Sequence, residues 1–161
     1  MSSERIYEIL ETVSDPEIPV LSILDLGIVR DVKQDEASGE LEVVITPTYS
    51  GCPAMDFIEV NIRAALEEAG IAQAKITTVL SPAWTTDWLT ESGKAKLKAY
   101  GIAPPVGSAD KLSLLGEKTE VECPRCGSTD TKLVSQFGST ACKSLYQCRD
   151  CLEPFDYFKC H

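Results

Sequence analysis

The chain has 161 residues, of which 43% are hydrophobic, and a formal net charge of −10. This composition is typical of a globular protein with a buried core. No apolar run approaches the roughly 20 residues that are needed to cross a bilayer, and the first residues lack the basic and apolar parts of a secretion signal. We therefore expect a cytoplasmic protein with no membrane partner.

Charge is distributed unevenly along the chain. The five acidic and five basic residues after position 120 cancel, so the whole net charge of −10 lies in residues 1–120. Phosphate backbones are bound by basic surfaces, so this balance argues against a nucleic-acid partner. It suits a protein partner with a basic face, or simply a solvated acidic surface.

Apolar side chains at helical spacing in residues 3–13 predict an amphipathic first helix, capped by Ser2 or Ser3. Asp15 and Glu17 flank a proline that ends this helix, because proline disfavours helix at its own position and at the residue before it. Two carboxylates around a rigid proline are either a ligand or docking pair, or a turn in which the aspartate caps a neighbouring backbone. The residues by themselves favour the turn.

Four further segments have the periodicity of regular secondary structure. They are residues 28–32, 41–46 and 76–80, as strands, and a helix that begins near residue 54 and has Gly70 as its C-cap. The order helix, strand, strand, helix, strand predicts an α+β protein. Its first part would be a small two-layer α/β domain, with helices packed on one sheet.

Cys52 lies in the turn between a predicted strand and the helix that starts near residue 54. Pro53 would take the first helical position, which proline favours. The dipole and the free N–H groups of a helix N-terminus stabilise a thiolate. A thiolate here could bind iron, zinc or an iron–sulfur cluster, or attack an electrophile. The alternative is a buried structural cysteine, since free cysteines are among the most buried residues; the local sequence leaves both open.

Trp84 and Trp88 lie in a stretch without helical or strand periodicity. They either dock a partner, because tryptophan is enriched at binding hot spots, or cover the open face of the small sheet, which is the interpretation we favour. After them, Thr90 can cap a short helix that ends at Gly101.

Residues 104–119 are rich in Gly, Pro, Ser and Lys, a composition that is typical of a linker. This gives an α/β domain over residues 1–103 and a module over residues 120–161. The module holds six of the seven cysteines, and four of them form two C-x-x-C pairs with 21 residues between the pairs. The pairs are Cys123 with Cys126 and Cys148 with Cys151. In a chain without a secretion signal, such pairs are typical of metal ligands rather than disulfides.

Two C-x-x-C knuckles together give tetrahedral coordination by four sulfurs. A module of about 40 residues is too small for a sufficient core, so a bound metal must supply folding free energy. We predict a zinc ribbon with a structural zinc ion; an iron ion or an iron–sulfur cluster on the same thiolates is the alternative. Cys142, Cys160 and His161 are left over, as a second, partial site or as bystanders. The sequence contains no Ser/His/Asp set, P-loop or dinucleotide-binding glycine motif.

Four motifs resemble the iron–sulfur assembly family of small α/β domains, which includes SufT-like bacterial proteins and eukaryotic cytosolic iron–sulfur targeting factors. The motifs are Asp15-Pro16-Glu17, Asp25-Leu26-Gly27, Thr46-Pro47-Thr48 and Gly51-Cys52-Pro53. The chain is also similar to one branch of this family, the PaaD family that accompanies phenylacetyl-CoA epoxidases. This similarity lies in the ribbon, in the stretch from Trp84 to Pro105 and in residues 137–143. The resemblance covers nearly the whole chain.

The resemblance implies an accessory function, without catalysis of its own, in the phenylacetyl-CoA epoxidase system of aerobic phenylacetate breakdown. The protein would help iron or an iron–sulfur cluster reach the oxygenase or the reductase subunit, and these subunits would be its partners. The functional thiol of the family corresponds to Cys52, and Asp15, Glu17, Asp25 and Thr46 would form the supporting loops. One protein thiolate cannot satisfy a cluster, so a homodimer, an exogenous thiol or the partner would complete the site.

Three other functions stay open from the sequence. A structural or assembly subunit would bind the epoxidase and carry no iron. An enzyme with Cys52 as its nucleophile would need a base, which the neighbouring sequence does not supply. A nucleic-acid-binding ribbon is disfavoured by the acidic charge.

Overall fold

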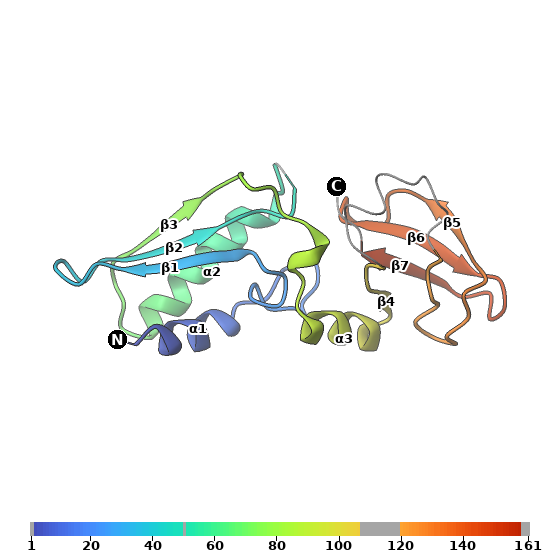
Figure 1. The fold of residues 1–161 in the computed structure, drawn as a ribbon, viewed down its shortest axis with the longest axis horizontal. Helices are drawn as coiled ribbons and strands as arrows, with labels where there is room; N and C mark the ends of the chain where they lie inside the picture. The colour runs from blue at the N-terminus through green and yellow to red at the C-terminus, as the bar shows by residue number, and fades with distance from the viewer. Residues whose placement is uncertain (1, 50, 107–119, 159–161) are drawn as a thin grey trace. The chain divides into compact units, whose positions relative to one another are not determined.

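The computed structural model describes residues 2–49, 51–106 and 120–158. The chain divides into two compact units, Met1–Trp84 and Thr85–His161. Figure 1 shows a sheet with helices in the first unit, and a second sheet that follows a further helix in the second. Among the described residues, no helix is both long and apolar enough to cross a membrane.

The first unit follows the element order that the sequence predicts. Its elements are α1 (Ser3–Glu11), β1 (Val29–Gln34), β2 (Leu41–Ile45), α2 (Ala54–Glu68) and β3 (Ala74–Thr78). β1 and β2 form an antiparallel hairpin, and β3 pairs with β2 in parallel, so the strand order is β1-β2-β3. The predicted α/β fold is therefore confirmed.

The core of the first unit is built from one face of the sheet and one face of each helix. Leu41, Val43 and Ile45, which alternate along β2, are at most 2% exposed, as expected for the buried face of a strand. Both helices bury apolar residues spaced three or four apart, which lie on one helix face. These are Ile6, Ile9 and Leu10 of α1 and Ile58, Ile62 and Leu66 of α2.

Local sequence signals set the helix ends to within one residue. The Ser2 hydroxyl accepts a hydrogen bond from the Arg5 backbone N–H (3.4 Å), so Ser2 caps α1 as predicted. Pro53 precedes α2 instead of occupying its first turn, and Gly70 follows the Ala69 C-cap with a φ of +87°. Glycine suits that position because it adopts a positive φ without strain.

β3 begins and ends two residues earlier than the pattern of β-branched residues indicates. The register with β2 gives the reason, because Leu41 pairs with Ala74 and Ile45 pairs with Thr78. The limits of this strand are thus set by its partner strand rather than by its own composition. Leu80, which the sequence places inside the strand, is 61% exposed.

The second unit combines a capped helix with a four-stranded sheet. Its elements are η1 (Thr86–Trp88), α3 (Glu91–Tyr100), β4 (Ile102–Ala103), β5 (Thr131–Ser135), β6 (Lys143–Cys148) and β7 (Pro154–Phe158). The Thr90 hydroxyl accepts a hydrogen bond from the Gly93 N–H (3.0 Å), and Gly101 ends α3 with a φ of +93°. Both helix caps predicted from the sequence are therefore confirmed.

The sheet of the second unit starts before the predicted linker. Ile102 and Ala103 form β4 and pair in parallel with β7, and the strand order is β4-β7-β6-β5. Residues 107–119, which make up most of that linker, lie outside the described residues. The domain boundaries expected at residues 103 and 120 stay predictions.

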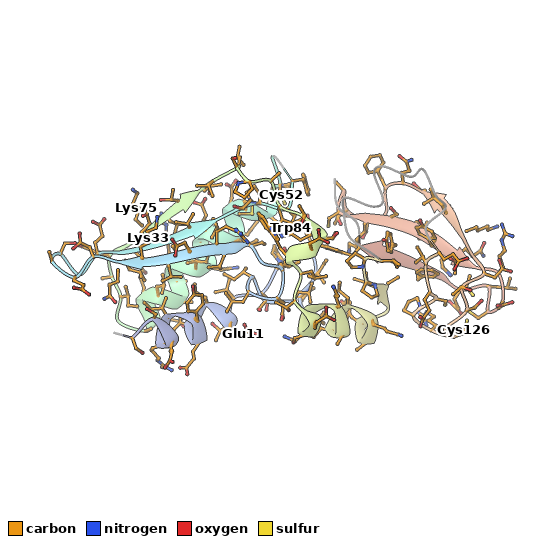
Figure 2. The ribbon with its side chains drawn as sticks, viewed as in Figure 1. Glu11, Lys33, Cys52, Lys75, Trp84 and Cys126 are labelled. Atoms are coloured by element: carbon orange, nitrogen blue, oxygen red, sulfur yellow. The ribbon has the colours of Figure 1, made fainter. Side chains whose placement is uncertain are left out.

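A charged network lies on the face of the first sheet that points away from the core. Glu42 alternates with the buried Leu41 and Val43 on β2, so its side chain points to this other face. Its carboxylate accepts a hydrogen bond from the Thr77 hydroxyl (2.6 Å) and lies 3.4 Å from the Lys75 ammonium, which is labelled in Figure 2. The Thr77 hydrogen bond, helped by Lys75, holds the pKa of Glu42 below its usual 4.5.

We expect Thr77→Val to destabilise the protein at neutral pH and to lose that effect in acid. The folded-state pKa of Glu42 is depressed, so its stabilising contribution is present above pH 4.5 and is lost as the pH falls through the folded-state value. Thermal melts of the parent and the variant at neutral pH and at about pH 3 measure the difference. Thr77→Ser keeps the hydroxyl and should melt like the parent. A deficit for Thr77→Val that is equally large in acid would contradict this assignment.

Candidate functional site

The second unit brings its two C-x-x-C pairs together into one cluster of four thiols. The first pair lies before β5, and the second begins at the last residue of β6. The four Sγ atoms lie within 4.8 Å of one another. Those of Cys123 and Cys151 are 3.8 Å apart, and those of Cys126 and Cys148 are 3.5 Å apart. Cys126 is labelled in Figure 2.

These distances fit one tetrahedral metal ion. For Zn–S bonds of about 2.3 Å in tetrahedral geometry, neighbouring sulfurs lie about 3.8 Å apart. The two observed separations lie close to that value. The four cysteines therefore fit a structural zinc ion, as the sequence predicts.

Backbone hydrogen bonds hold the two knuckles in place. The Cys123 N–H donates to the Ser128 carbonyl (2.8 Å), and the Gly127 N–H donates to the Cys123 carbonyl (2.9 Å). Gly127 has a φ of +76°, which only glycine adopts without strain. The Arg149 N–H donates to the Asp130 carbonyl (2.8 Å), which ties the second knuckle to the start of β5. The metal site is thus shaped by turns that the local sequence encodes.

The thiols of the cluster differ in acidity. Hydrogen bonds from the Cys151 and Asp150 backbones lower the pKa of Cys148 to about 7. At Cys126 a hydrogen bond from the Ser128 backbone favours the thiolate, but the neighbouring Cys148 thiol and burial outweigh it and raise the pKa to about 12. Cys148 thus forms a thiolate more readily than Cys126 does. A bound divalent cation would favour the thiolate form of all four cysteines.

Little apolar core supports this cluster. The buried residues of the ribbon are few, and two of them, Cys123 and Cys148, are themselves members of the thiol cluster. Tyr146 stacks on Phe155 at a ring separation of 5.9 Å and meets Tyr157 edge-on at 5.5 Å. Because the core is this small, a bound metal ion would supply a large share of the folding free energy.

The second candidate site lies in the first unit, where β2 ends and α2 begins. Cys52 is partly buried in this turn and is labelled in Figure 2. Its N–H donates to the Tyr49 carbonyl (3.3 Å), and its carbonyl accepts from the Met55 N–H (3.2 Å). These two bonds fix Cys52 immediately before the first turn of α2. The prediction of its position, at a strand-to-helix turn, is therefore correct.

Thr46 is the first residue after β2 and leads into this turn. Its N–H donates to the Ile28 carbonyl (2.9 Å), which continues the pairing with the start of β1. Its side chain is buried, at 1% exposure, and its hydroxyl has no hydrogen-bond partner in the described part of the chain. An unsatisfied buried hydroxyl costs about 1–3 kcal/mol. Such groups are rare in proteins, and each is explained by a bound water or ion, by local strain or by a functional role.

Asp15 and Asp25, which the sequence associates with Cys52, are both buried and both cap turns. Asp15 Oδ1 accepts from the backbone N–H groups of Glu17 (2.8 Å) and Ile18 (2.9 Å). Asp25 Oδ2 accepts from the Ser22 N–H (3.2 Å), and the Ser22 hydroxyl accepts from the Asp25 N–H (3.1 Å). Both carboxylates thus shape loops, which agrees with the turn favoured for Asp15. A direct contribution of Asp15, Glu17 or Asp25 to ligand binding stays a prediction.

Trp84 holds in place the loop that contains Asp25 and Leu26. The indole is 4% exposed, and its Nε1–H donates to the Leu26 carbonyl (2.7 Å) in the segment that leads into β1. Trp84 is therefore a buried structural residue of the first unit and not an exposed docking residue; that it covers the open face of the sheet stays a prediction. Trp88 is partly exposed. The sequence carried no signal for the contact between Trp84 and Leu26, because the two residues lie far apart along the chain.

The remaining cysteines do not join either site among the described residues. Cys142 is buried, with its Sγ 3.0 Å from the Thr140 hydroxyl oxygen. It lies four residues after Gly138, where an added Cβ would lie 2.8 Å from Asp156 Oδ1, so a side chain there would displace the Asp156 carboxylate. Cys160 and His161 lie outside the described residues.

The fold and the thiol cluster define a class of protein in which a small α/β domain is joined to a four-cysteine zinc ribbon. Residues 3–80 match the family model of iron–sulfur cluster assembly proteins, and residues 107–159 match that of the PaaD zinc beta ribbon domain. A protein from Escherichia coli (strain K12), provisionally named as a 1,2-phenylacetyl-CoA epoxidase subunit, is 51% identical over 97% of this chain and 92% of its own length. The chain belongs to the PaaD family.

Other similar proteins match a smaller part of the chain. An Fe–S protein maturation auxiliary factor from Porphyromonas gingivalis (strain W83) is 37% identical over 60% of this chain and 90% of its own length. The crystal structure of a domain of unknown function, DUF59, from Bacillus anthracis matches 58% of this chain and 89% of its own, with a TM-score of 0.54 and 28% identity. A conserved hypothetical protein from Thermotoga maritima, at 23% identity and a TM-score of 0.51, shares the fold.

Proposed function

We propose that this protein is an accessory factor for iron–sulfur assembly in a phenylacetyl-CoA epoxidase system, and that it is not itself the catalyst. It would help iron or an iron–sulfur cluster reach the oxygenase or the reductase subunit during aerobic phenylacetate degradation. The names of the relatives from E. coli and P. gingivalis support the two halves of this proposal, the epoxidase and the maturation step.

One structural observation carries the proposal. Cys52 lies at the start of α2, in a different unit from the four thiols that form the ribbon site. Among the described residues, the protein thus has one four-thiol cluster that suits structural zinc, and a partly buried cysteine outside it, Cys52. A single thiolate suits transient holding of a cargo, since a cluster normally takes four ligands.

The loops around Cys52 would place and complete this transient site. The main-chain bonds to Tyr49 and Met55 hold the Cys52 backbone at the helix start, where N–H groups favour an anion. The Thr46 hydroxyl, which has no protein partner among the described residues, would donate to a bound group. The remaining ligands would come from a small thiol, a second copy of the chain or the client subunit.

A structural subunit that binds the epoxidase and carries no iron is the second candidate. It is favoured by the turn-capping hydrogen bonds of Asp15 and Asp25, since these bonds give the two carboxylates a structural task that needs no metal. This candidate requires metal only at the ribbon. It also makes Cys52 dispensable for epoxidase activity.

We expect Cys52→Ser to abolish iron binding and to leave zinc binding intact. The measurement is the iron, zinc and acid-labile sulfide content of parent and variant, both purified without oxygen, together with epoxidase activity in cells that carry each form. The proposal expects one zinc per chain in both proteins, iron only in the parent, and no epoxidase activity with the variant.

Cys142→Ser is the matched control, because it removes a thiol that joins neither site. It should keep both iron and zinc. Full epoxidase activity with Cys52→Ser would favour the structural subunit, and equal iron in parent and Cys52→Ser would place the iron in the ribbon.

A further inference from the structure

The outward face of α2 carries apolar side chains that the fold leaves uncovered. Phe57 is 67% exposed and Val60 is 63% exposed. Residues spaced three and four apart share a helix face, so Ala64, also exposed, continues the stripe that these two begin. Clustered exposed aromatic and aliphatic residues are unusual on a monomer surface and commonly mark a binding site. We call Phe57, Val60 and Ala64 the α2 stripe.

A groove adjoins this stripe. It has a volume of about 290 Å³ and runs between α2 and the end of α1. Its walls include Asn61, Ala64 and Glu68 from α2, and Thr12 and Ser14 from the segment after α1. Ala64 belongs both to the stripe and to the groove, so the two features form one continuous surface.

Acidic residues border this surface. α2 has the sequence AMDFIEVNIRAALEE, with four acidic residues and one arginine. The arginine, Arg63, donates to the Ala74 carbonyl at the edge of β3 (3.1 Å), and Glu59 accepts from the Thr78 hydroxyl (3.1 Å), so both turn toward β3. The other three acidic residues are exposed, and the described part of the chain offers them no salt bridge; they are Asp56, Glu67 and Glu68.

The position of the stripe connects it to the candidate thiol. Cys52 lies immediately before α2, and Phe57 lies near the start of the same helix. A protein docked on the stripe would therefore lie within one or two helical turns of Cys52, at a rise of about 1.5 Å per residue.

We propose that the α2 stripe and its groove are the docking site for the client subunit of the epoxidase system. The recognised segment would be apolar on one side and would carry lysine or arginine beside its apolar residues. This inference rests on the proposed function for the identity of the client. Charge complementarity selects the occupant: a basic segment is attracted by the acidic border, whereas a second copy of this face would bring like charges together.

The experiment titrates the full chain with the purified oxygenase subunits and, separately, with the purified reductase subunit, at low and high salt. We expect one of them to bind the parent chain, with an affinity that falls as salt rises. The double variant Phe57→Ser/Val60→Ser should weaken this binding about tenfold or more, as expected for truncation of central apolar contacts. Both side chains are exposed, so circular dichroism should match the parent.

Two further variants sharpen the test. Glu68→Lys should weaken binding and flatten its salt dependence, and it suits the end of α2 because a cation is favourable at a helix C-terminus. Leu133→Ser/Val134→Ser is the matched control: these residues are 49% and 54% exposed on β5, in the other unit. This control should bind like the parent.

Three results would overturn the docking site. In the first, neither the oxygenase subunits nor the reductase subunit binds the parent chain. In the second, the β5 control loses as much client affinity as the α2 double variant. In the third, the α2 double variant binds the client as tightly as the parent does. A homodimer of the parent that the double variant breaks, with client binding unchanged, would make this face a self-interface instead.

Failure of the docking site can be told apart from failure of the proposed function. Cys52→Ser should bind the client with parent affinity while losing iron. If Cys52→Ser keeps full epoxidase activity but the α2 double variant loses client binding, the docking site is supported and the iron-carrying function is contradicted. If Cys52→Ser behaves as proposed but the double variant binds the client with parent affinity, only the docking site is contradicted.

Discussion

Cys148→Ser is expected to release the zinc ion and to unfold β5, β6 and β7. Apparent binding free energies of structural zinc in small zinc-binding peptides are about 10–16 kcal/mol, as large as the whole stability of a typical domain, about 5–15 kcal/mol. Loss of the ligand at Cys148 should have a large effect on stability, because this residue is fully buried in the small ribbon core. Zinc content by mass spectrometry and amide NMR signals from the three strands measure the effect.

Cys142→Ser provides the control for this substitution. Cys142 is also a buried cysteine of the second unit, but it lies outside the four-thiol cluster. It should retain zinc and a dispersed spectrum. A Cys148→Ser protein that keeps both one zinc per chain and ordered ribbon strands would show that the metal is not what holds this sheet together.

Trp84→Ala is expected to lower the free energy of unfolding by about 3–5 kcal/mol, the range for truncating a buried tryptophan. The indole fills space in the first unit and satisfies the Leu26 carbonyl, so the variant loses both packing and a hydrogen bond. Trp84→Phe keeps most of the packing and should cost less, about 1–3 kcal/mol for the unpaired carbonyl. Urea unfolding followed by circular dichroism measures both variants.

Trp88→Phe is the matched control, because Trp88 is only partly buried. It should cost clearly less than Trp84→Ala. If Trp84→Ala and Trp88→Phe unfold at the same urea concentration, Trp84 does not secure the loop before β1 in the way that the hydrogen bond to Leu26 indicates.

The ribbon site could be predicted from sequence because its geometry is local. A C-x-x-C pair places two sulfurs on one tight turn, and two such turns meet when the strands between them pair. The pairing of β5 with β6 brings this about. The helices were likewise predictable, since Ser2, Thr90 and Gly101 act within a few residues of their own position.

The contacts that hold the loops of the first unit could not be predicted in the same way. They join residues that are distant along the chain, such as Trp84 with Leu26 and Thr46 with Ile28. Periodicity reports only which face of an element is apolar, not which loop it meets. The limits of β3 escaped prediction for the same reason, because β2 sets them.

Phe57 and Val60 carried a signal that periodicity could have revealed. They fall on the polar side of a helix whose buried side is already marked by Ile58, Ile62 and Leu66. An apolar residue on the wrong face of an amphipathic helix is a departure from the pattern. At such positions we expect the surface to have a function other than stabilising the fold.

The pairing of β4 with β7 limits how this protein can be cut and recombined. The matched ribbon model begins at residue 107, after β4 has ended, yet β4 supplies the outer strand of the sheet. A ribbon transplanted from residue 107 onward would leave the backbone of β7 unpaired along one side, and exposed strand edges invite association between chains. The transferable piece is therefore longer than the cysteine pattern suggests and has to include Ile102 and Ala103.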